Sequence, residues 1–175
     1  MASRVLMTKN QMSSIIDKLA SEILSNHQDE QNLVLVGIKR RGADIATRIC
    51  NLLEKALGRK VPLGELDINL YRDDWTKLSG KPHIGISHIP VNLDNKIVIL
   101  IDDVLFSGRT VRAALEALFD YGRPEKVELL TFVDRGHREL PIYAKYIGSC
   151  IETRKEAHVD VLLEERDGIE AVMIE

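Results

Sequence analysis

The sequence has no long apolar run and no apolar segment near its start. Its main uncharged apolar stretch, Ile97 to Ile101, is far shorter than the roughly 20 residues that a membrane-spanning helix needs. Residues 1–10 lack the apolar region of a secretory signal peptide. We therefore expect a cytoplasmic protein that has no membrane partner.

Cysteine and excess charge are also scarce. Cys50 and Cys150 lie far apart in the sequence and have no cluster of histidines beside them, so neither a disulfide framework nor a zinc site is indicated. We expect both to behave as small core residues. The sequence contains 24 lysines and arginines and 27 aspartates and glutamates, which gives a net charge of −3. The strongly basic balance that would indicate nucleic-acid binding is absent, which leaves room only for a local basic patch.

What is present is typical of one folded domain. The chain has 175 residues, and 45% of them are apolar. Apolar residues recur at steps of three and four over residues 11–26, which predicts a helix with one buried stripe. Residues 33–38 are almost purely apolar, as in a parallel strand covered on both faces. A basic turn follows, and then a second helix that ends at Gly58.

The rest of the chain continues this alternation of strands and helices. Residues 65–70 alternate like a half-buried strand. Residues 72–85 have no period and predict a long mobile loop or a hairpin, and a loop of that length in a compact domain is either functional or a mistaken assignment. A buried strand at 97–101, a helix at 110–121 and a strand at 127–133 together predict a right-handed parallel crossover. Finally, a hairpin is predicted near the end of the given sequence. Apolar and polar residues alternate over 159–163, Asp167-Gly168 supplies a turn, and residues 169–174 are again largely apolar. The fold class is α/β.

The segment from Val98 to Thr110 carries the clearest chemistry. An apolar strand runs into Asp102 and Asp103, and a Ser-Gly-Arg-Thr turn then opens a helix. Backbone N–H groups and hydroxyls at a helix N-terminus favour a phosphate, and Gly108 allows a close backbone approach. The two acids can accept hydrogen bonds from vicinal hydroxyls such as those of a ribose. Asp103 or Ser107 alone would be an ordinary turn or cap residue, but the joint pattern is specific for a sugar phosphate.

A second phosphate contact is predicted at Lys39, Arg40 and Arg41. This basic loop follows a parallel strand and is well placed for a diphosphate, although a solvated basic turn is the alternative. Gly37 and Gly42 have the spacing of a P-loop, but Ala43-Asp44 stands where that motif requires Lys and Ser or Thr. The sequence also has no G-x-G-x-x-G. A nucleoside triphosphatase and a dinucleotide enzyme are therefore disfavoured.

The Val98 to Thr110 segment resembles the phosphoribosyl diphosphate (PRPP) motif of type I phosphoribosyltransferases. The wider chain resembles the PyrR family, whose members are uracil phosphoribosyltransferases, several of which also regulate pyrimidine operons by binding messenger RNA. The segments that carry this resemblance are residues 35–42, 64–68 with 71–74, and 133–142. The resemblance implies the type I fold, in which helices flank a parallel sheet. It also implies a flexible catalytic loop over 72–88, and a small hood together with the C-terminal strands over residues 134–175, all within one domain spanning residues 1–175.

The resemblance also implies the site. For the ribose and 5′-phosphate of PRPP the matching residues are Asp102, Asp103, Val104, Leu105, Phe106, Ser107, Gly108, Arg109 and Thr110. For the diphosphate they are Lys39, Arg40, Arg41 and Gly42. For the base in the hood they are Val133, Asp134 and Arg135, although Asp134 and Arg135 could equally form an ion pair at the strand end. The residues implied in catalysis are Arg40, Arg41, Arg72, Asp102 and Asp103.

The implied reaction joins uracil to PRPP and releases UMP and diphosphate, with Mg²⁺ carried mainly by PRPP. The resemblance also implies a homo-oligomer, a dimer or higher. Hypoxanthine-guanine phosphoribosyltransferases have an aspartate immediately before the small-Gly pair, where this chain has Phe106. A pyrimidine base is therefore favoured over a purine.

An RNA-binding regulator controlled by UMP, with weak or residual transferase activity, is the alternative function. In the regulatory members, polar and basic side chains on the first helix and after the Leu-Pro-Ile segment face RNA. The matching positions here are Asp17, Ser21, Gln28, Tyr143 and Ser149. The acid repels phosphates, and each missing cation removes a counterion-release contribution. We therefore expect an enzyme whose RNA binding is weak.

Overall fold

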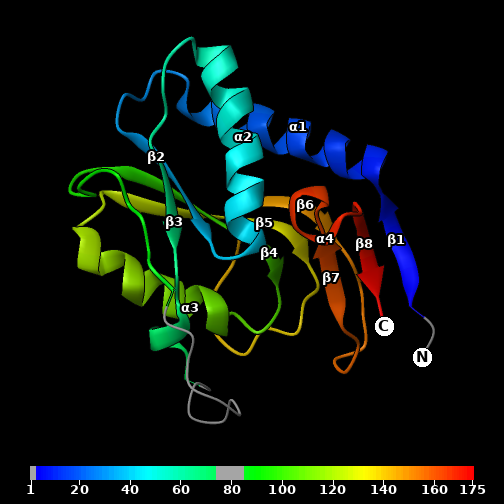
Figure 1. The fold of residues 1–175 in the computed structure, drawn as a ribbon. Helices are drawn as coiled ribbons and strands as arrows, with labels where there is room; N and C mark the ends of the chain where they lie inside the picture. Colours follow the sequence, from blue (N-terminus) through cyan, green and yellow to red (C-terminus); the bar gives the residue numbers. More distant parts are fainter. Residues whose placement is uncertain (1–2, 74–84) are drawn as a thin grey trace.

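A computed structural model of the chain describes residues 3–73 and 85–175 (Figure 1). A five-stranded parallel sheet has the order β3-β2-β4-β5-β6, and a three-stranded antiparallel sheet has the order β1-β8-β7. The strands are β1 (Arg4–Thr8), β2 (Leu33–Ile38), β3 (Leu63–Leu66), β4 (Ile97–Leu105), β5 (Lys126–Asp134), β6 (Tyr146–Cys150), β7 (Val159–Leu162) and β8 (Ala171–Ile174). The helices are α1 (Lys9–His27), α2 (Arg41–Leu57), α3 (Arg109–Leu118) and α4 (Glu164–Asp167), with 3-10 turns η1 (Asn69–Tyr71) and η3 (Phe119–Tyr121).

The large sheet is covered on both faces, as its apolar strands predicted. Side chains alternate between the two faces of a strand, so Leu35 and Ile99 join the core beneath α1 and α2. Val36 and Leu100, their neighbours in sequence, join the second core beneath α3. Figure 1 shows α1 and α2 on one side of this sheet and α3 on the other. Within the described ranges no helix is long and apolar enough to cross a membrane.

The two long helices confirm the sequence prediction closely. α1 begins at Lys9 and ends at His27, and its stripe from Met12 to Ile23 is buried. α2 ends at Leu57, and Gly58 takes a left-handed φ of 63° while its N–H donates to the Glu54 carbonyl at 2.9 Å. The hairpin near the end is confirmed as the antiparallel pair of β7 and β8. The short helix α4, which the sequence did not predict, lies between these two strands.

Two local predictions were wrong. The strand predicted over 65–70 ends at Leu66, because the Asp67 carboxylate accepts the Asn69 backbone N–H at 3.0 Å and starts the turn η1. Leu70 is consequently 58% exposed. Cys50 is buried as expected, but Cys150 ends the edge strand β6 and is exposed.

Two strands, β1 and β6, escaped the sequence analysis. β1 pairs with β8, so residues near the two ends of the chain lie side by side in the small sheet (Figure 1). Residues 74–84, which make up most of the predicted loop, lie outside the described residues. His88, near the end of that loop, exchanges backbone hydrogen bonds with Glu65 at 2.8 Å.

A buried polar cluster lies at the amino end of β5. The Glu128 carboxylate accepts hydrogen bonds from Tyr146 and Lys145 at 2.8 and 2.7 Å and lies 2.8 Å from His27 Nε2. Burial acts to raise the pKa of Glu128, but the hydrogen bonds from Lys145, His27 and Tyr146 outweigh it and lower the pKa to about 2. The ionised carboxylate therefore holds the C-terminal end of α1 to β5 and β6.

This cluster predicts an acid-sensitive contribution to stability. A carboxyl whose folded pKa lies below its unfolded value stabilises the fold above the unfolded pKa. That contribution, on the order of 3 kcal/mol, is lost as the pH falls from about 4.5 to about 2. Glu128→Gln should therefore flatten the decline in unfolding free energy across this range, as measured by urea denaturation at several pH values. Parallel curves for the variant and the wild type would contradict this account.

Candidate active site

The candidate site lies where the neighbouring parallel strands β2, β4 and β5 end. The carboxyl ends of parallel strands share one edge of a sheet, and ligands of open α/β sheets bind outside this edge. This edge brings together the predicted basic loop after β2, the acids and turn at the end of β4, and the predicted nucleobase residues Val133 to Arg135 at the end of β5. α2 and α3 both begin at this edge, so their N-terminal N–H groups are directed toward it.

Glycine allows the first two segments to meet. A Cβ on Gly42 would lie 2.6 Å from the Ile101 carbonyl oxygen and 3.1 Å from the Asp102 Cα. A Cβ on Gly37 would lie only 2.4 Å from the Ala43 Cα. The N-terminus of α2 therefore packs directly against the acidic end of β4, in a space that no side chain could share.

The paired acids lie in a polar but poorly solvated place. Asp102 is buried and Asp103 is partly buried. The Asp103 backbone N–H donates to Asp102 Oδ1 at 3.0 Å, and the Val104 N–H donates to Asp103 Oδ1 at 2.9 Å. Burial raises the pKa of both carboxyl groups, and the charge of Asp103 raises the pKa of Asp102 further. Hydroxyl donors or a cation brought by a ligand would stabilise this pair.

The turn after β4 has the geometry expected at the start of a helix. Gly108 takes a φ of 90°, which favours glycine, and α3 follows with ten residues. The Ser107 hydroxyl oxygen accepts the Arg109 backbone N–H at 3.4 Å, so Ser107 acts partly as the ordinary cap residue of the alternative interpretation. The Ser107 carbonyl accepts the N–H groups of Glu139 and Leu140 at 2.9 and 3.2 Å, which fixes the turn to the segment after β5.

The side chains of the remaining residues in the predicted PRPP segment do not all point toward one binding site. Val104 and Leu105 are still part of β4, and Leu105 is buried in the core beneath α3. Thr110, in the first turn of α3, is partly buried. The Arg109 side chain is exposed and binds Asp73 at 2.5 Å and Glu139 at 2.8 Å. It therefore links α3 to the start of the predicted loop, where Arg72 is partly buried.

The three cations of the basic loop have different surroundings. Lys39 Nζ donates to the Ile86 carbonyl at 2.7 Å and lies 3.3 Å from Glu65. Arg41 is held by Asp167 at 3.0 Å and Asp160 at 3.4 Å, both from the small-sheet region. Arg40 is exposed and has no side-chain partner in the part of the chain that the structure describes. The solvated-turn alternative is therefore wrong for Lys39 and Arg41 and fits only Arg40.

A cavity of about 420 Å³ joins the basic loop to the acids. Its lining residues are Arg40, Arg41, Asp103, Arg166 and Asp167. The last two come from α4, which the sequence analysis did not connect with the site. No short-range pattern reveals this contact, because α4 and the basic loop are separated by most of the chain.

The predicted base segment forms a second cavity of about 740 Å³. Its lining residues are residues 134–138, Tyr143 and residues 150–153. Arg135 is 5% exposed, its guanidinium lies 4.2 Å from the centroid of the Phe106 ring, and its Nη2 donates to the Arg154 carbonyl at 2.9 Å. Arg135 Nε and the Thr153 hydroxyl oxygen are buried and have no hydrogen-bond partner among the described residues.

Two expectations for this segment need correction. Asp134 does not pair with Arg135, because its carboxylate binds Arg138. Val133 does not line the cavity, since its side chain is fully buried in the core beneath α1 and α2.

Arg138 is a structural residue that the sequence analysis missed. Besides Asp134, its guanidinium donates to the carbonyls of Phe106 at 2.7 Å, Ile142 at 3.0 Å and Gly136 at 3.1 Å. It thereby fixes the turn after β4 to the segment after β5. An arginine in a polar loop has no sequence pattern that would predict bonds to backbone carbonyls.

Comparison with known proteins identifies the family of this chain. The phosphoribosyl transferase domain family matches residues 6–166. The chain is 47% identical over 173 residues to the "Bifunctional protein PyrR" of Syntrophobacter fumaroxidans, covering 99% of this chain and 93% of the relative. It is 48% identical over 163 residues to the protein of the same name from Enterococcus faecalis, covering 93% and 91%.

Solved structures share the fold at low sequence identity. The hypoxanthine phosphoribosyltransferase of Trypanosoma cruzi superposes with a TM-score of 0.72 at 15% identity, covering 98% of this chain and 95% of that chain. A hypoxanthine phosphoribosyltransferase of Staphylococcus aureus gives 0.65 at 23% identity, covering 86% and 79%. These likenesses establish the type I architecture predicted from the sequence. The match of nearly the whole chain to the domain family and to the PyrR proteins then settles its place: this chain belongs to the phosphoribosyltransferase family, among the PyrR proteins.

Proposed function

We propose that this protein transfers the phosphoribosyl group of PRPP to uracil, giving UMP and diphosphate. One observation carries the proposal. The acid pair Asp102 and Asp103, the glycine turn at the N-terminus of α3 and a cavity beside polar atoms that have no partner among the described residues all lie at one edge of the sheet. The acid pair suits a sugar, the glycine turn suits its phosphate, and the cavity suits a base. The curated relatives that carry the PyrR name support the same reaction.

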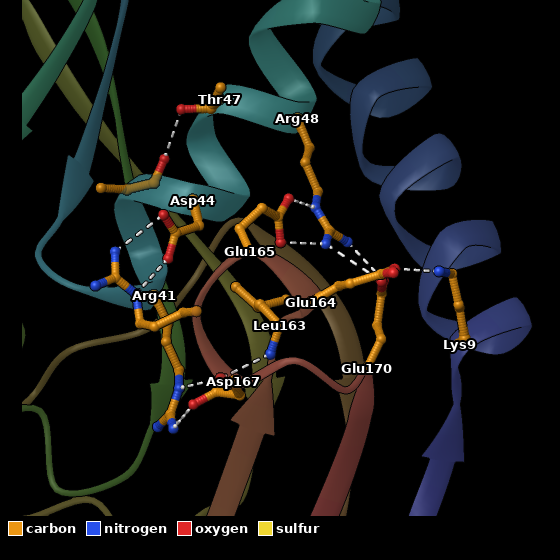
Figure 2. Close-up of polar contacts among 12 residues, drawn as sticks. Lys9, Arg41, Asp44, Thr47, Arg48, Leu163, Glu164, Glu165, Asp167 and Glu170 are labelled. Atoms are coloured by element: carbon orange, nitrogen blue, oxygen red, sulfur yellow. Dashed lines mark hydrogen bonds and ion pairs between the residues drawn. The ribbon is translucent and has the colours of Figure 1, made fainter.

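The groups of PRPP would bind along this edge. Asp102 and Asp103 accept hydrogen bonds from the ribose hydroxyls, and the turn from Ser107 to Thr110 binds the 5′-phosphate through backbone N–H groups. Displacement by uracil N1 leaves negative charge on the diphosphate while the ribose becomes cationic. Arg40, the cation of the basic loop that has no side-chain partner among the described residues, is the side chain best able to stabilise the leaving group. Arg41 holds the basic loop in place through its ion pairs with Asp160 and Asp167, the second of which Figure 2 shows.

Magnesium fits this arrangement as an ion carried by the substrate. The described residues contain no group of three His, Cys, Asp or Glu side chains that could hold a metal. Asp102 and Asp103 offer hard oxygen donors, and Mg²⁺ is commonly bound by one or two carboxylates together with substrate phosphates. The bound ion would neutralise charge that develops on the diphosphate.

The second cavity suits a pyrimidine. Arg135 Nε and the Thr153 hydroxyl are buried beside this cavity and have no hydrogen-bond partner among the described residues. Once a bound base reaches them, Nε can donate to a carbonyl oxygen and the hydroxyl can donate or accept. Apart from the reacting N1, uracil presents two carbonyl oxygens and one N–H, at N3, which matches these groups. Phe106, held beneath the Arg135 guanidinium, places an apolar ring where the purine enzymes have an acid.

RNA binding is the second candidate function, because the curated relatives are named bifunctional. Asp17, Ser21, Gln28 and Tyr143 are exposed and Ser149 is partly buried. None of these side chains is a cation, and Asp17 is an acid. We therefore propose that regulation through RNA is weak in this protein.

Replacing both acids tests the PRPP site. Asp102→Asn with Asp103→Asn should raise the Kd for PRPP at least about tenfold, since hydrogen bonds to charged groups contribute roughly 1.5–3 kcal/mol. The fold should persist, because the change removes two adjacent like charges. The matched control, Asp29→Asn with Glu30→Gln, removes adjacent acids before β2, at the opposite end of the sheet. Unchanged PRPP affinity in a folded Asp102 and Asp103 variant, by calorimetry, would refute the assignment.

The RNA proposal predicts weak binding without sequence preference. A labelled PyrR-type hairpin and a scrambled control, titrated at two salt concentrations with and without UMP, should bind alike. The salt slope should be shallow, since each neutralised phosphate contributes about −0.7 to −0.9. Tight, selective binding that UMP enhances would instead show a bifunctional regulator.

A further inference from the structure

The base-wall turn, residues 134–138, forms one wall of the cavity proposed for the base, and its backbone is unusual. Gly136 and His137 both have left-handed φ angles, of 72° and 60°. Glycine adopts this conformation freely, but histidine adopts it at a cost in free energy, so the surroundings must hold His137 in place. Such strained residues cluster at functional sites, where the surrounding contacts compensate for the cost.

Arg138 closes the base-wall turn with its own side chain. Its guanidinium binds the Asp134 carboxylate and donates to the Gly136 carbonyl at 3.1 Å. The Gly136 backbone N–H donates in turn to Asp134 Oδ1 at 2.9 Å. The side chains of Arg138 and Asp134 are only 16% and 14% exposed. The turn is therefore built around a largely buried ion pair, which holds its first residue and its middle together.

The same guanidinium reaches the turn after β4, which carries the proposed 5′-phosphate site. Arg138 Nη1 donates to the Phe106 carbonyl at 2.7 Å, and Nε donates to the Ile142 carbonyl at 3.0 Å. Nε and both Nη atoms therefore already bind protein acceptors. Although Arg138 lines the cavity, its effect on a ligand must pass through the two turns that it joins.

Backbone hydrogen bonds join other parts of these two segments and do not depend on Arg138. The Ser107 carbonyl accepts the N–H groups of Glu139 and Leu140, and the Arg135 N–H donates to the Leu105 carbonyl at 3.1 Å. These contacts lie on either side of the two left-handed residues. The turn after β4 would thus keep its place without the guanidinium, whereas the middle of the base-wall turn would lose its contact with it.

The proposed reaction makes the distance between the two turns important. The 5′-phosphate is bound at the turn after β4 and the base is bound against the base-wall turn, so their separation sets how N1 of uracil meets C1 of the ribose. A misplacement of about 1 Å at the reacting atoms can lower a rate on the order of 100-fold. A side chain that fixes one turn against the other therefore controls this alignment without touching either reactant.

We propose that Arg138 is a positioning residue that couples the base site to the phosphate site, and that Asp134 holds its guanidinium in place. This inference rests on the proposed function, because it takes the two turns as the sites of the base and the 5′-phosphate. The competing explanation is that the pair of Asp134 and Arg138 only stabilises the fold.

Ligands that contact one turn or both separate these explanations. Ribose 5-phosphate lacks the base, so it should bind without the base-wall turn, whereas UMP should contact both turns. In the full-length protein, Arg138→Met should leave the Kd for ribose 5-phosphate within about twofold of wild type and raise the Kd for UMP roughly tenfold, the effect of one hydrogen bond to a charged group. It should lower kcat at least about tenfold while the KM for PRPP changes less than about threefold.

Two further variants complete the experiment. Asp134→Asn keeps the shape of the side chain and weakens its hold on Arg138, so it should raise the Kd for UMP by a smaller factor, about threefold. Arg59→Met is the matched control, because Arg59 is also partly buried and donates to a backbone carbonyl, that of Glu30, at the opposite end of the sheet. This control should leave both Kd values unchanged.

The readouts are calorimetric titration with each ligand, steady-state kinetics and the thermal midpoint of each variant. Equal weakening of both ligands by Arg138→Met, or unchanged UMP binding in that variant, would overturn the inference while PRPP turnover by the wild type left the proposed function intact. If Arg138→Met does not fold, Asp134→Asn decides, and unchanged or tighter UMP binding there would overturn the inference. Failure of the wild type to bind UMP or use PRPP would overturn both.

Discussion

Parallel pairing of β2, β4 and β5 is the constraint on which the rest of the structure depends. This pairing places three loops, which are far apart in the sequence, at one edge of the sheet. The buried cores on the two faces of the sheet keep the strands in register. The close approach of Gly42 to Ile101 and Asp102 then brings the basic loop against the acids. The basic loop and the acidic end of β4 lie side by side because the glycine at position 42 lets the two backbones come into contact.

Surroundings, more than residue type, give the charged groups their roles. Arg40 and Arg41 are neighbours in sequence, yet Arg41 is neutralised by two carboxylates and Arg40 is free among the described residues. Arg135 and Arg138 are three positions apart, and one stacks on Phe106 while the other binds backbone carbonyls. The small sheet, which joins β1 to β7 and β8, presents α4 to the site, so residues near both ends of the chain support it.

Patterns that act over short distances were predictable from the sequence. The apolar runs of β2 and β4, the helical stripes of α1 and α2 and the turn at Gly108 each depend on neighbouring residues, and the sequence indicates them directly. The pairing of β1 with β8, the docking of α4 on α2 and the carbonyl contacts of Arg138 were not predictable, because each joins segments that no local pattern connects. Cys150 is instructive for the same reason. Its exposure follows from the position of β6 at the sheet edge, which its own neighbours do not reveal.

The central claim is that this edge of the sheet joins a pyrimidine base to PRPP. The most direct measurement is PRPP-dependent nucleotide formation by the full-length protein with uracil, orotate and hypoxanthine, followed side by side with Mg²⁺ present. The account predicts UMP from uracil, and kcat/KM values for orotate and hypoxanthine that are lower by at least about tenfold, the effect of a single unsatisfied polar contact. Turnover of hypoxanthine or orotate that equals or exceeds that of uracil would contradict it.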